Sequence, residues 1–116
     1  MFDESQETTL ILINVKTKLT PGSADEYLTA NRPFLEATRR EPGNKWYEHF
    51  RSVDDPDTIL TQEAFDDAAA GEAHVNSEHF QQYLADNDTK HLVAQVPDII
   101  YLDVPEQDGW GKMAEF

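Results

Sequence analysis

The sequence contains no cysteine among its 116 residues, and this absence excludes several kinds of chemistry. Without cysteine the chain can form no disulfide, no thiolate metal site and no cysteine nucleophile. Its apolar runs, such as Leu10–Ile13, are far too short to span a membrane. The first nine residues, MFDESQETT, lack the basic and then apolar layout of a secretion signal. Together these absences predict a soluble, cytoplasmic protein.

Basic residues are also scarce, with 9 Lys and Arg against 23 Asp and Glu, which gives a net charge of −14. Such a surface repels phosphate backbones, so nucleic acid is not an expected partner. Negatively charged substrates are disfavoured as well, unless a local Arg or Lys cluster attracts them. The excess of acid fits a well-solvated surface, and adaptation to high salt is the alternative explanation. The length and the 39% of hydrophobic residues predict one globular domain with a modest core.

No internal repeat, low-complexity segment or linker divides the chain. Four segments rich in β-branched and aromatic residues predict strands. These cover residues 9–19, 45–52, 58–65 and 98–104. We therefore expect an N-terminal extension over residues 1–8, one domain over 9–104 and a C-terminal tail over 105–116.

Two helices are predicted between these strands, and each contains a break. The first begins at Ser23, which has the capping-box spacing to Glu26, and Pro33 predicts a kink near Asn31–Arg32. The helix stops at the Glu-Pro-Gly turn of residues 41–43. The second helix is capped by Asp66 or Asp67, and a further N-cap at Ser77 predicts a restart at Glu78.

The resulting order, β-α-β-β-α-β, predicts a ferredoxin-like α+β sandwich with the helices on one face of an antiparallel sheet. The first strand is apolar on both faces, with Ile11, Ile13 and Val15 on one side and Leu10 and Leu12 on the other. Helices can cover only one of these faces. The second cover is most simply another subunit, so a homodimer is expected.

Four stretches, in order, resemble the antibiotic biosynthesis monooxygenase family of dimeric α/β barrels. They are TLILINVKTKLTPG, EPGNKWYEHFRSVDDPDT, LTQEAFDDAAAGEAHVNSEHFQQY and the closing strand. The resemblance covers roughly residues 9–104, and its most specific part runs from Glu41 to Tyr83. It implies a dimeric barrel with a pocket between the helices and the sheet. The family includes cofactor-free monooxygenases of quinols and phenols, haem-degrading enzymes and isomerases of signalling molecules.

The resemblance favours oxidation of a small aromatic, phenolic or quinol substrate by dioxygen, without metal or flavin. A deprotonated phenol is electron-rich enough to reduce dioxygen, so the protein must hold the ring, stabilise the phenolate and accept a proton. Asn14 is the candidate donor to the developing oxyanion, His74 the candidate base, and Glu63 a candidate buried acid with a raised pKa. Each also has a structural explanation. Asn14 can be satisfied by backbone, His74 can be a half-exposed helix residue, and Glu63 can pair with an Arg.

Five aromatic residues are candidates for the wall of the pocket. Side chains on a strand alternate between its two faces, so either Trp46 with Phe50 or Tyr47 with His49 faces the pocket, but not both pairs. Phe65 stands where many relatives have Trp. The substrate-binding prediction comprises Trp46, Phe50, Phe65, Phe80 and Tyr83.

Neither haem nor a metal ion is expected. Haem-degrading relatives use an Asn on the first strand, which Asn14 matches, and a Trp and a His ligand on the second helix. His74 falls at the Trp position, Leu84 falls near the ligand position, and His79 has the wrong helical phase to replace it. His74 and His79 are five residues apart, whereas a metal pair on one helical face needs a spacing of three or four.

Two other functions fit the same scaffold. One is a non-catalytic binder of a small molecule. The other is an isomerase or degrader of a small signalling metabolite, with His74 and Glu63 as acid and base. Trp110 and Phe116 in the otherwise polar tail predict a docked tail rather than a free one, and the sequence leaves open whether it docks across the dimer.

Overall fold

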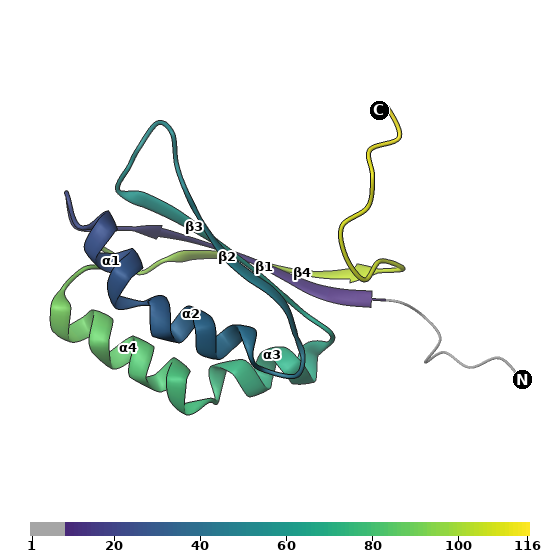
Figure 1. The fold of residues 1–116 in the computed structure, drawn as a ribbon, viewed down its shortest axis with the longest axis horizontal. Coiled ribbons are helices and arrows are strands. Elements are labelled where there is room, and N and C mark those ends of the chain that lie inside the picture. Colours follow the sequence, from purple (N-terminus) through teal and green to yellow (C-terminus); the bar gives the residue numbers. More distant parts are fainter. Residues whose placement is uncertain (1–8) are drawn as a thin grey trace, which may run out of the picture.

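The computed structural model describes residues 9–116, apart from the side chain of Thr89, and contains four strands and four helices in that range (Figure 1). The predicted extension 1–8 lies outside the described residues. The elements are β1 (Thr9–Lys18), α1 (Ala24–Ala30), α2 (Arg32–Arg39), β2 (Asn44–Arg51), β3 (Thr58–Phe65), α3 (Ala68–Val75), α4 (Glu78–Lys90) and β4 (Asp98–Pro105). The predicted order is confirmed, and each strand boundary lies within one residue of its predicted position.

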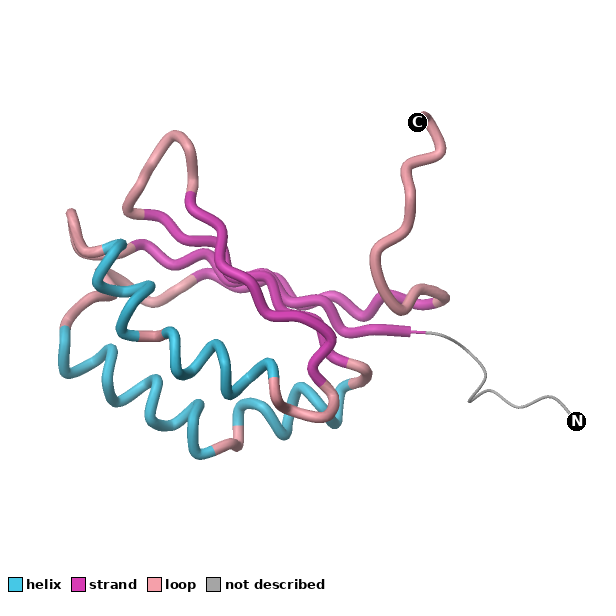
Figure 2. Tube along the Cα trace, viewed as in Figure 1, coloured by secondary structure: helices cyan, strands magenta, loops and turns pink. Residues whose placement is uncertain are grey.

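The four strands form one antiparallel sheet in the order β2-β3-β1-β4. All four helices lie on one face of this sheet, and the C-terminal tail leaves β4 toward the other face (Figures 1 and 2). This is the predicted ferredoxin-like α+β fold. We call the face without helices the outer face.

The two apolar faces of β1 are covered in different ways. On the helix side, Ile11 and Ile13 form a buried cluster with Phe65. On the outer face, the tail folds back so that Trp110 stacks on Trp46, with ring centroids 5.3 Å apart. Trp110 therefore docks on its own chain and supplies part of the second cover that β1 requires, whereas Phe116 is fully exposed.

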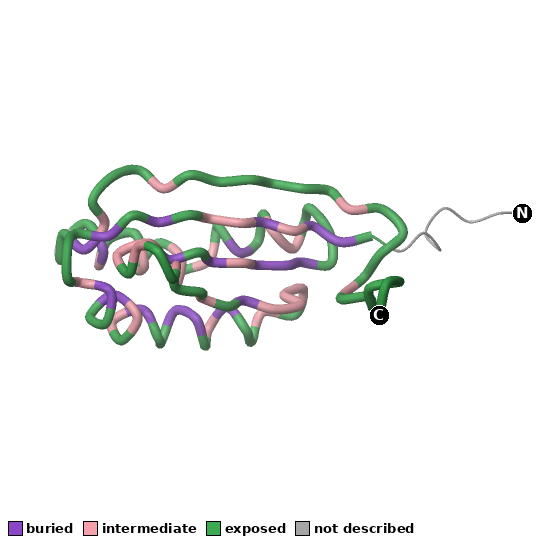
Figure 3. The backbone as a smooth tube through the Cα atoms, turned by 90° about the horizontal axis from the view of Figure 1, so that it is seen from above, coloured by how far each residue is buried: buried purple, intermediate pink, exposed green. Residues whose placement is uncertain are grey.

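The edge strand β4 remains open on both faces. It runs along the side of the molecule as a mostly exposed segment (Figure 3). Its apolar residues Ile99, Ile100, Tyr101 and Leu102 are all exposed. Because β4 pairs only with β1 within residues 9–116, its other edge is available for a partner.

The break between α1 and α2 falls at Asn31, two residues before Pro33, as the sequence predicts. Buried Asn31 and Asn87 join the break to α4, because each side-chain amide donates to the other's oxygen at 3.1 Å.

The predicted capping box at Ser23 is wrong. The backbone of Ser23 is not extended, and its hydroxyl instead donates to the carbonyl of Thr20 at 2.6 Å.

The N-caps of α3 and α4 are confirmed. The side chain of Asp67 accepts a hydrogen bond from Ala70 N at 2.9 Å, and Ser77 accepts one from Phe80 N at 3.2 Å. The second cap restarts the helix in a new direction, so that α3 and α4 follow the sheet as two segments (Figure 2). None of the helices within residues 9–116 is long and apolar enough to cross a membrane.

Candidate functional site

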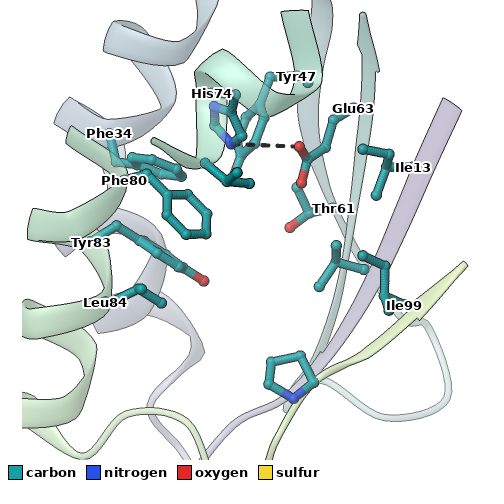
Figure 4. A pocket seen from close by; sticks show the side chains of 14 residues that line it. Ile13, Phe34, Tyr47, Thr61, Glu63, His74, Phe80, Tyr83, Leu84 and Ile99 are labelled. Atoms are coloured by element: carbon teal, nitrogen blue, oxygen red, sulfur yellow. Dashed lines mark ion pairs between the residues drawn. The ribbon is translucent and has the colours of Figure 1, made fainter. Parts of the chain in front are cut away.

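A cavity of about 280 Å³ lies between the helices and the sheet (Figure 4). This volume lies just below the usual range for small-molecule sites, about 300–1,000 Å³. The helices contribute aromatic and aliphatic side chains to one wall, and the sheet contributes the other. The labelled residues are Phe34, Phe80, Tyr83 and Leu84 on the helix side, Ile13, Tyr47, Thr61, Glu63 and Ile99 on the sheet side, and His74 from α3.

His74 lies in the last turn of α3 with only 3% of its surface exposed. Its Nε2 is 3.7 Å from Glu63 Oε1, and its Nδ1 is 2.8 Å from Glu41 Oε2. The rings of Phe65 and Phe80 each pack against the imidazole of His74 at a centroid distance of 5.2 Å. Burial lowers the pKa of His74, although the hydrogen bond and charge of Glu41 act in the opposite direction. The imidazole is therefore held neutral at physiological pH, which leaves it able to accept a proton.

Glu63 extends from β3 toward the same end of the cavity and is buried. Burial, followed by the charge of Glu41, raises the pKa of Glu63 to about 7. Its carboxyl group therefore changes protonation state near neutral pH. The pKa of this carboxyl group is raised and that of the neighbouring imidazole is lowered. Acid–base sites typically contain such a pair in a cavity.

Glu41 and His79 belong to the same network, and neither was among the site residues predicted from the sequence. Glu41 lies in the loop between α2 and β2, and its Oε2 also forms a hydrogen bond with His79 Nε2. The loop approaches α3 closely at Gly43, where a β-carbon would collide with the side chain of Ala70. The Glu-Pro-Gly turn was visible in the sequence, but its contact with the second helix depends on tertiary structure.

The donor atoms of Glu41, His74 and His79 lie within 4.8 Å of one another, close enough together to hold a metal ion. The spacing of three or four applies to two ligands on one continuous helix, and the sequence already predicts a break between His74 and His79. Because the chain breaks between α3 and α4, the two imidazoles converge although they are five residues apart. In the structure, each of these atoms already takes part in a hydrogen bond with the Glu41 carboxylate or with an imidazole.

Thr61 provides a hydroxyl group on the sheet wall of the cavity. Its Oγ1 is 2.9 Å from His49 Nδ1, and burial together with Arg39 and Arg32 lowers the pKa of His49 to about 4. His49 is thus neutral, and its buried Nε2 has no hydrogen-bond partner among the described residues. A buried N–H without an acceptor is costly, so we assign the ring proton to Nδ1, where it donates to Thr61. The Thr61 hydroxyl can then donate to an oxygen in the cavity or to the hydroxyl of Tyr47, which also lines the cavity.

The predicted site residues divide between the two faces of the sheet. Of the predicted catalytic residues, His74 and Glu63 face the cavity. Of the predicted substrate-binding residues, Phe80 and Tyr83 face it as well. Phe65 is fully buried and packs against the His74 ring without lining the cavity.

Asn14, Trp46 and Phe50 lie on the outer face. Asn14 lies opposite Gln62 in the sheet and therefore shares its face. Glu63 is the next residue after Gln62 on β3, so Asn14 and Glu63 point to opposite faces. Gln62 donates to Asn14 Oδ1 at 3.3 Å and accepts from Trp46 Nε1 at 3.1 Å. Asn14 therefore cannot act together with His74 on one bound molecule. On β2 it is Tyr47 and His49 that point toward the helices, and Tyr47 lines the cavity.

The sequence profile of the family described as antibiotic biosynthesis monooxygenase matches residues 10–86, which is well over half of the chain. The chain belongs to this family. It is 27% identical over 97 residues to the Bacillus subtilis (strain 168) protein named "Putative monooxygenase YcnE", covering 84% of this chain and 100% of that protein. Family membership supports a monooxygenase-type function in general terms.

Solved structures agree with this assignment at the level of the fold. PA3566 from Pseudomonas aeruginosa is 29% identical, with a TM-score of 0.70 over 82% of this chain and 92% of that one. SO0527 from Shewanella oneidensis is 23% identical, with a TM-score of 0.75 over 86% and 95% of the two chains.

Proposed function

We propose that the protein is a cofactor-independent monooxygenase that oxidises a small phenolic or quinol substrate with dioxygen. The observation that carries this proposal is the mostly apolar cavity that ends in the Glu63–His74 pair. Membership of the antibiotic biosynthesis monooxygenase family supports the same class of reaction.

The cavity is suited to a flat, uncharged ring. Phe34 and Tyr83 line its helix side, where their rings stack on each other at a centroid distance of 4.4 Å. Ile13 and Ile99 form the opposite, aliphatic wall. A ring between these walls exchanges water for apolar and π contacts, and its hydroxyl group points to the polar end of the cavity.

The polar end supplies the acid–base chemistry of the reaction. Neutral His74, with Glu63 beside it, accepts the proton of the substrate hydroxyl and leaves an electron-rich phenolate. The phenolate reduces dioxygen, one oxygen atom enters the ring and the other leaves as water. A hydroquinone plus O₂ thus gives a hydroxyquinone plus H₂O, and the substrate supplies all the electrons.

Thr61 takes the oxyanion-stabilising role that the sequence suggested for Asn14. Its hydroxyl lies on the cavity wall and its oxygen is already held by His49. A positioned donor costs little reorganisation when charge develops on the substrate oxygen. Asn14, on the outer face, is expected to have no effect on catalysis.

Oxygen uptake with a panel of hydroquinones and anthrone-like phenols, together with product analysis, tests this function. His74→Ala should lower turnover about 100- to 10,000-fold, the usual loss for a general base. Thr61→Val should lower it about 100- to 1,000-fold, the usual loss for one oxyanion donor. The matched controls are His91→Asn, at an exposed left-handed position that Asn tolerates, and Thr29→Val, at an exposed position of α1. Both should retain full activity.

Two results would contradict the proposal. Full activity of His74→Ala across pH 5–9 would remove the base from the mechanism. Product formation without oxygen uptake would show an isomerase or another non-oxidative enzyme at the same cavity.

A further inference from the structure

Four side chains form a continuous chain from the cavity toward the surface. Glu63 and His74 line the cavity, and Glu41 and His79 follow behind His74. The exposed fraction rises along the last three, from 3% for the His74 side chain to 14% for Glu41 and 28% for His79. Glu41 thus occupies the position behind the candidate base that the orienting carboxylate has in other acid–base sites.

We infer that Glu41 is a positioning residue that fixes the tautomer of His74, and that His79 holds Glu41 in place for this task. We call Glu41, His74 and His79 the carboxylate clamp. The inference deepens the proposed function and rests on it for its catalytic consequence. The arrangement of protons that it specifies can be measured without any substrate.

The hydrogen-bond pattern determines where the protons lie. Both Nδ1 of His74 and Nε2 of His79 point at the same oxygen, Glu41 Oε2. An ionised carboxylate can only accept, so each imidazole must carry its proton on the nitrogen that faces Glu41. In neutral His74 the other nitrogen, Nε2, therefore has a lone pair directed toward Glu63 and the cavity. This is the tautomer that a base acting in the cavity requires.

The clamp also prepares the site for the charge that appears during the reaction. When His74 Nε2 accepts a proton, the ring becomes an imidazolium with its Nδ1–H already bonded to the Glu41 carboxylate. Such a charge-assisted hydrogen bond is roughly twice as strong as a neutral one. Glu63 on β3 and His79 on α4 also face His74. Two phenols lie nearby, Tyr47 on β2 and Tyr83 on α4, and burial raises the pKa of both, so they stay uncharged.

The backbone around Glu41 is built to hold this geometry. Its N–H donates to Thr38 O at 3.0 Å, and its carbonyl accepts from Asn44 N at 3.1 Å. The adjacent Gly43 carbonyl accepts from Asp66 N at 2.8 Å, just ahead of the helix that carries His74. The loop is thus fixed at both ends against α2, β2 and the start of α3.

The first test is the tautomer of His74, measured by long-range ¹H–¹⁵N correlation NMR of the native protein labelled with ¹⁵N-histidine. We expect the Nδ1–H form for His74 and the Nε2–H form for His79. Glu41→Leu should remove the preference of His74, and Glu41→Gln should lower its pKa because the negative charge is lost. Glu72→Gln, the same charge change at an exposed position of α3, is the matched control and should leave both properties unchanged.

The second test separates the clamp from the proposed oxidation. If a phenol is oxidised, Glu41→Gln should lower kcat as much as about 10⁴-fold with little change in KM, as loss of the carboxylate does in Ser-His-Asp triads. The expected tautomers without any turnover would support the clamp and contradict the oxidation. An Nε2–H tautomer in native His74 would overturn the clamp whatever the activity.

A metal ion is the competing occupant of the same three side chains, and Co²⁺ titration of the native protein distinguishes the two. We expect no d–d absorption band at stoichiometric Co²⁺. A band that is lost in both Glu41→Gln and His79→Ala would show that these residues are metal ligands, and would overturn the clamp.

Discussion

Glu63 illustrates how one buried side chain couples the stability of the protein to pH. Its pKa rises from the ordinary value of 4.5 to about 7, mainly because burial disfavours the carboxylate. An acid whose pKa is raised on folding stabilises the native state most when it is protonated. Its contribution is fully present below about pH 4.5 and is lost as the pH rises to about 7. His74 has the opposite trend, because its pKa is lowered and its contribution disappears as the pH falls below 6.5.

The substitution Glu63→Gln should therefore remove a pH-dependent loss of stability. A shift from 4.5 to about 7 corresponds to roughly 3 kcal/mol. Between pH 4.5 and 8, we expect the free energy of unfolding of the native protein to fall by about this amount relative to that of Glu63→Gln. His74 is present in both proteins, so its own titration largely cancels. Urea unfolding at several pH values measures the difference.

Glu48→Gln, at an exposed position of β2, is the control for this experiment. It should follow the native protein at every pH. A stability difference between Glu63→Gln and the native protein that does not change with pH would show that Glu63 titrates normally.

At the scale of the elements, the two helix breaks create the site. The break at Asn31 allows α1 and α2 to follow the sheet and places Phe34 in the cavity. The break between α3 and α4 brings His74 and His79 to the same carboxylate. A continuous helix in either place would separate these side chains.

The Asn31–Asn87 pair should contribute measurably to stability, because it closes the first break. Removing one amide leaves the other buried without its partner, which typically costs about 1–3 kcal/mol. We expect Asn31→Ala and Asn87→Ala each to lower the free energy of unfolding by this amount. The double variant should lose less than the sum, since it leaves no unpaired amide. Urea denaturation of all four proteins measures the coupling, and losses that add within about 0.5 kcal/mol would show that the pair contributes nothing of its own.

The breaks and caps could be predicted from the sequence because their signals are local. Pro33, Asp67 and Ser77 act through neighbouring backbone groups. The predicted bounds of β3, residues 58–65, are those of the structure. Ser23 has the same kind of signal and fails, because its hydroxyl has a competing acceptor in the preceding turn.

The site was less predictable because it depends on which face each strand presents. Alternation shows that Trp46 and Tyr47 point in opposite directions, but the sequence does not say which one meets the helices. The register of β2 shifts at a bulge between Asn44 and Trp46, and only the folded sheet settles the direction. Glu41 is 33 residues from His74 in the chain, and no local pattern connects them.

At the scale of the whole molecule, the homodimer expected from β1 remains a prediction, and the structure changes how it should be tested. Ile13 and Val15 face the helices, so substitutions there test folding rather than association. The apolar residues available to a second copy are on β4 and the outer face. Leu102 is 43% exposed and lies opposite Leu12 in the sheet.

We expect the native protein to sediment as a dimer at micromolar concentration and Leu102→Asp to sediment as a folded monomer. An unpaired charge is costly in an interface but not on an exposed strand. With −14 charges on each copy, association should strengthen with salt, because salt screens the repulsion between copies. Val53→Asp, in an almost fully exposed loop, is the control and should remain dimeric. A native monomer at both low and high salt would contradict the prediction.

The stacking of Trp110 on Trp46 has a consequence for spectroscopy. These are the two tryptophans of the chain, and both lie on the outer face. Intrinsic tryptophan fluorescence will therefore report the docking of the tail, while the cavity, lined by Tyr47 and Tyr83, contributes only tyrosine emission. Two indoles at this distance should also give an exciton couplet in circular dichroism. Release of the tail would abolish the couplet before the core unfolds, so tryptophan and far-ultraviolet signals should give different midpoints in the same denaturation experiment.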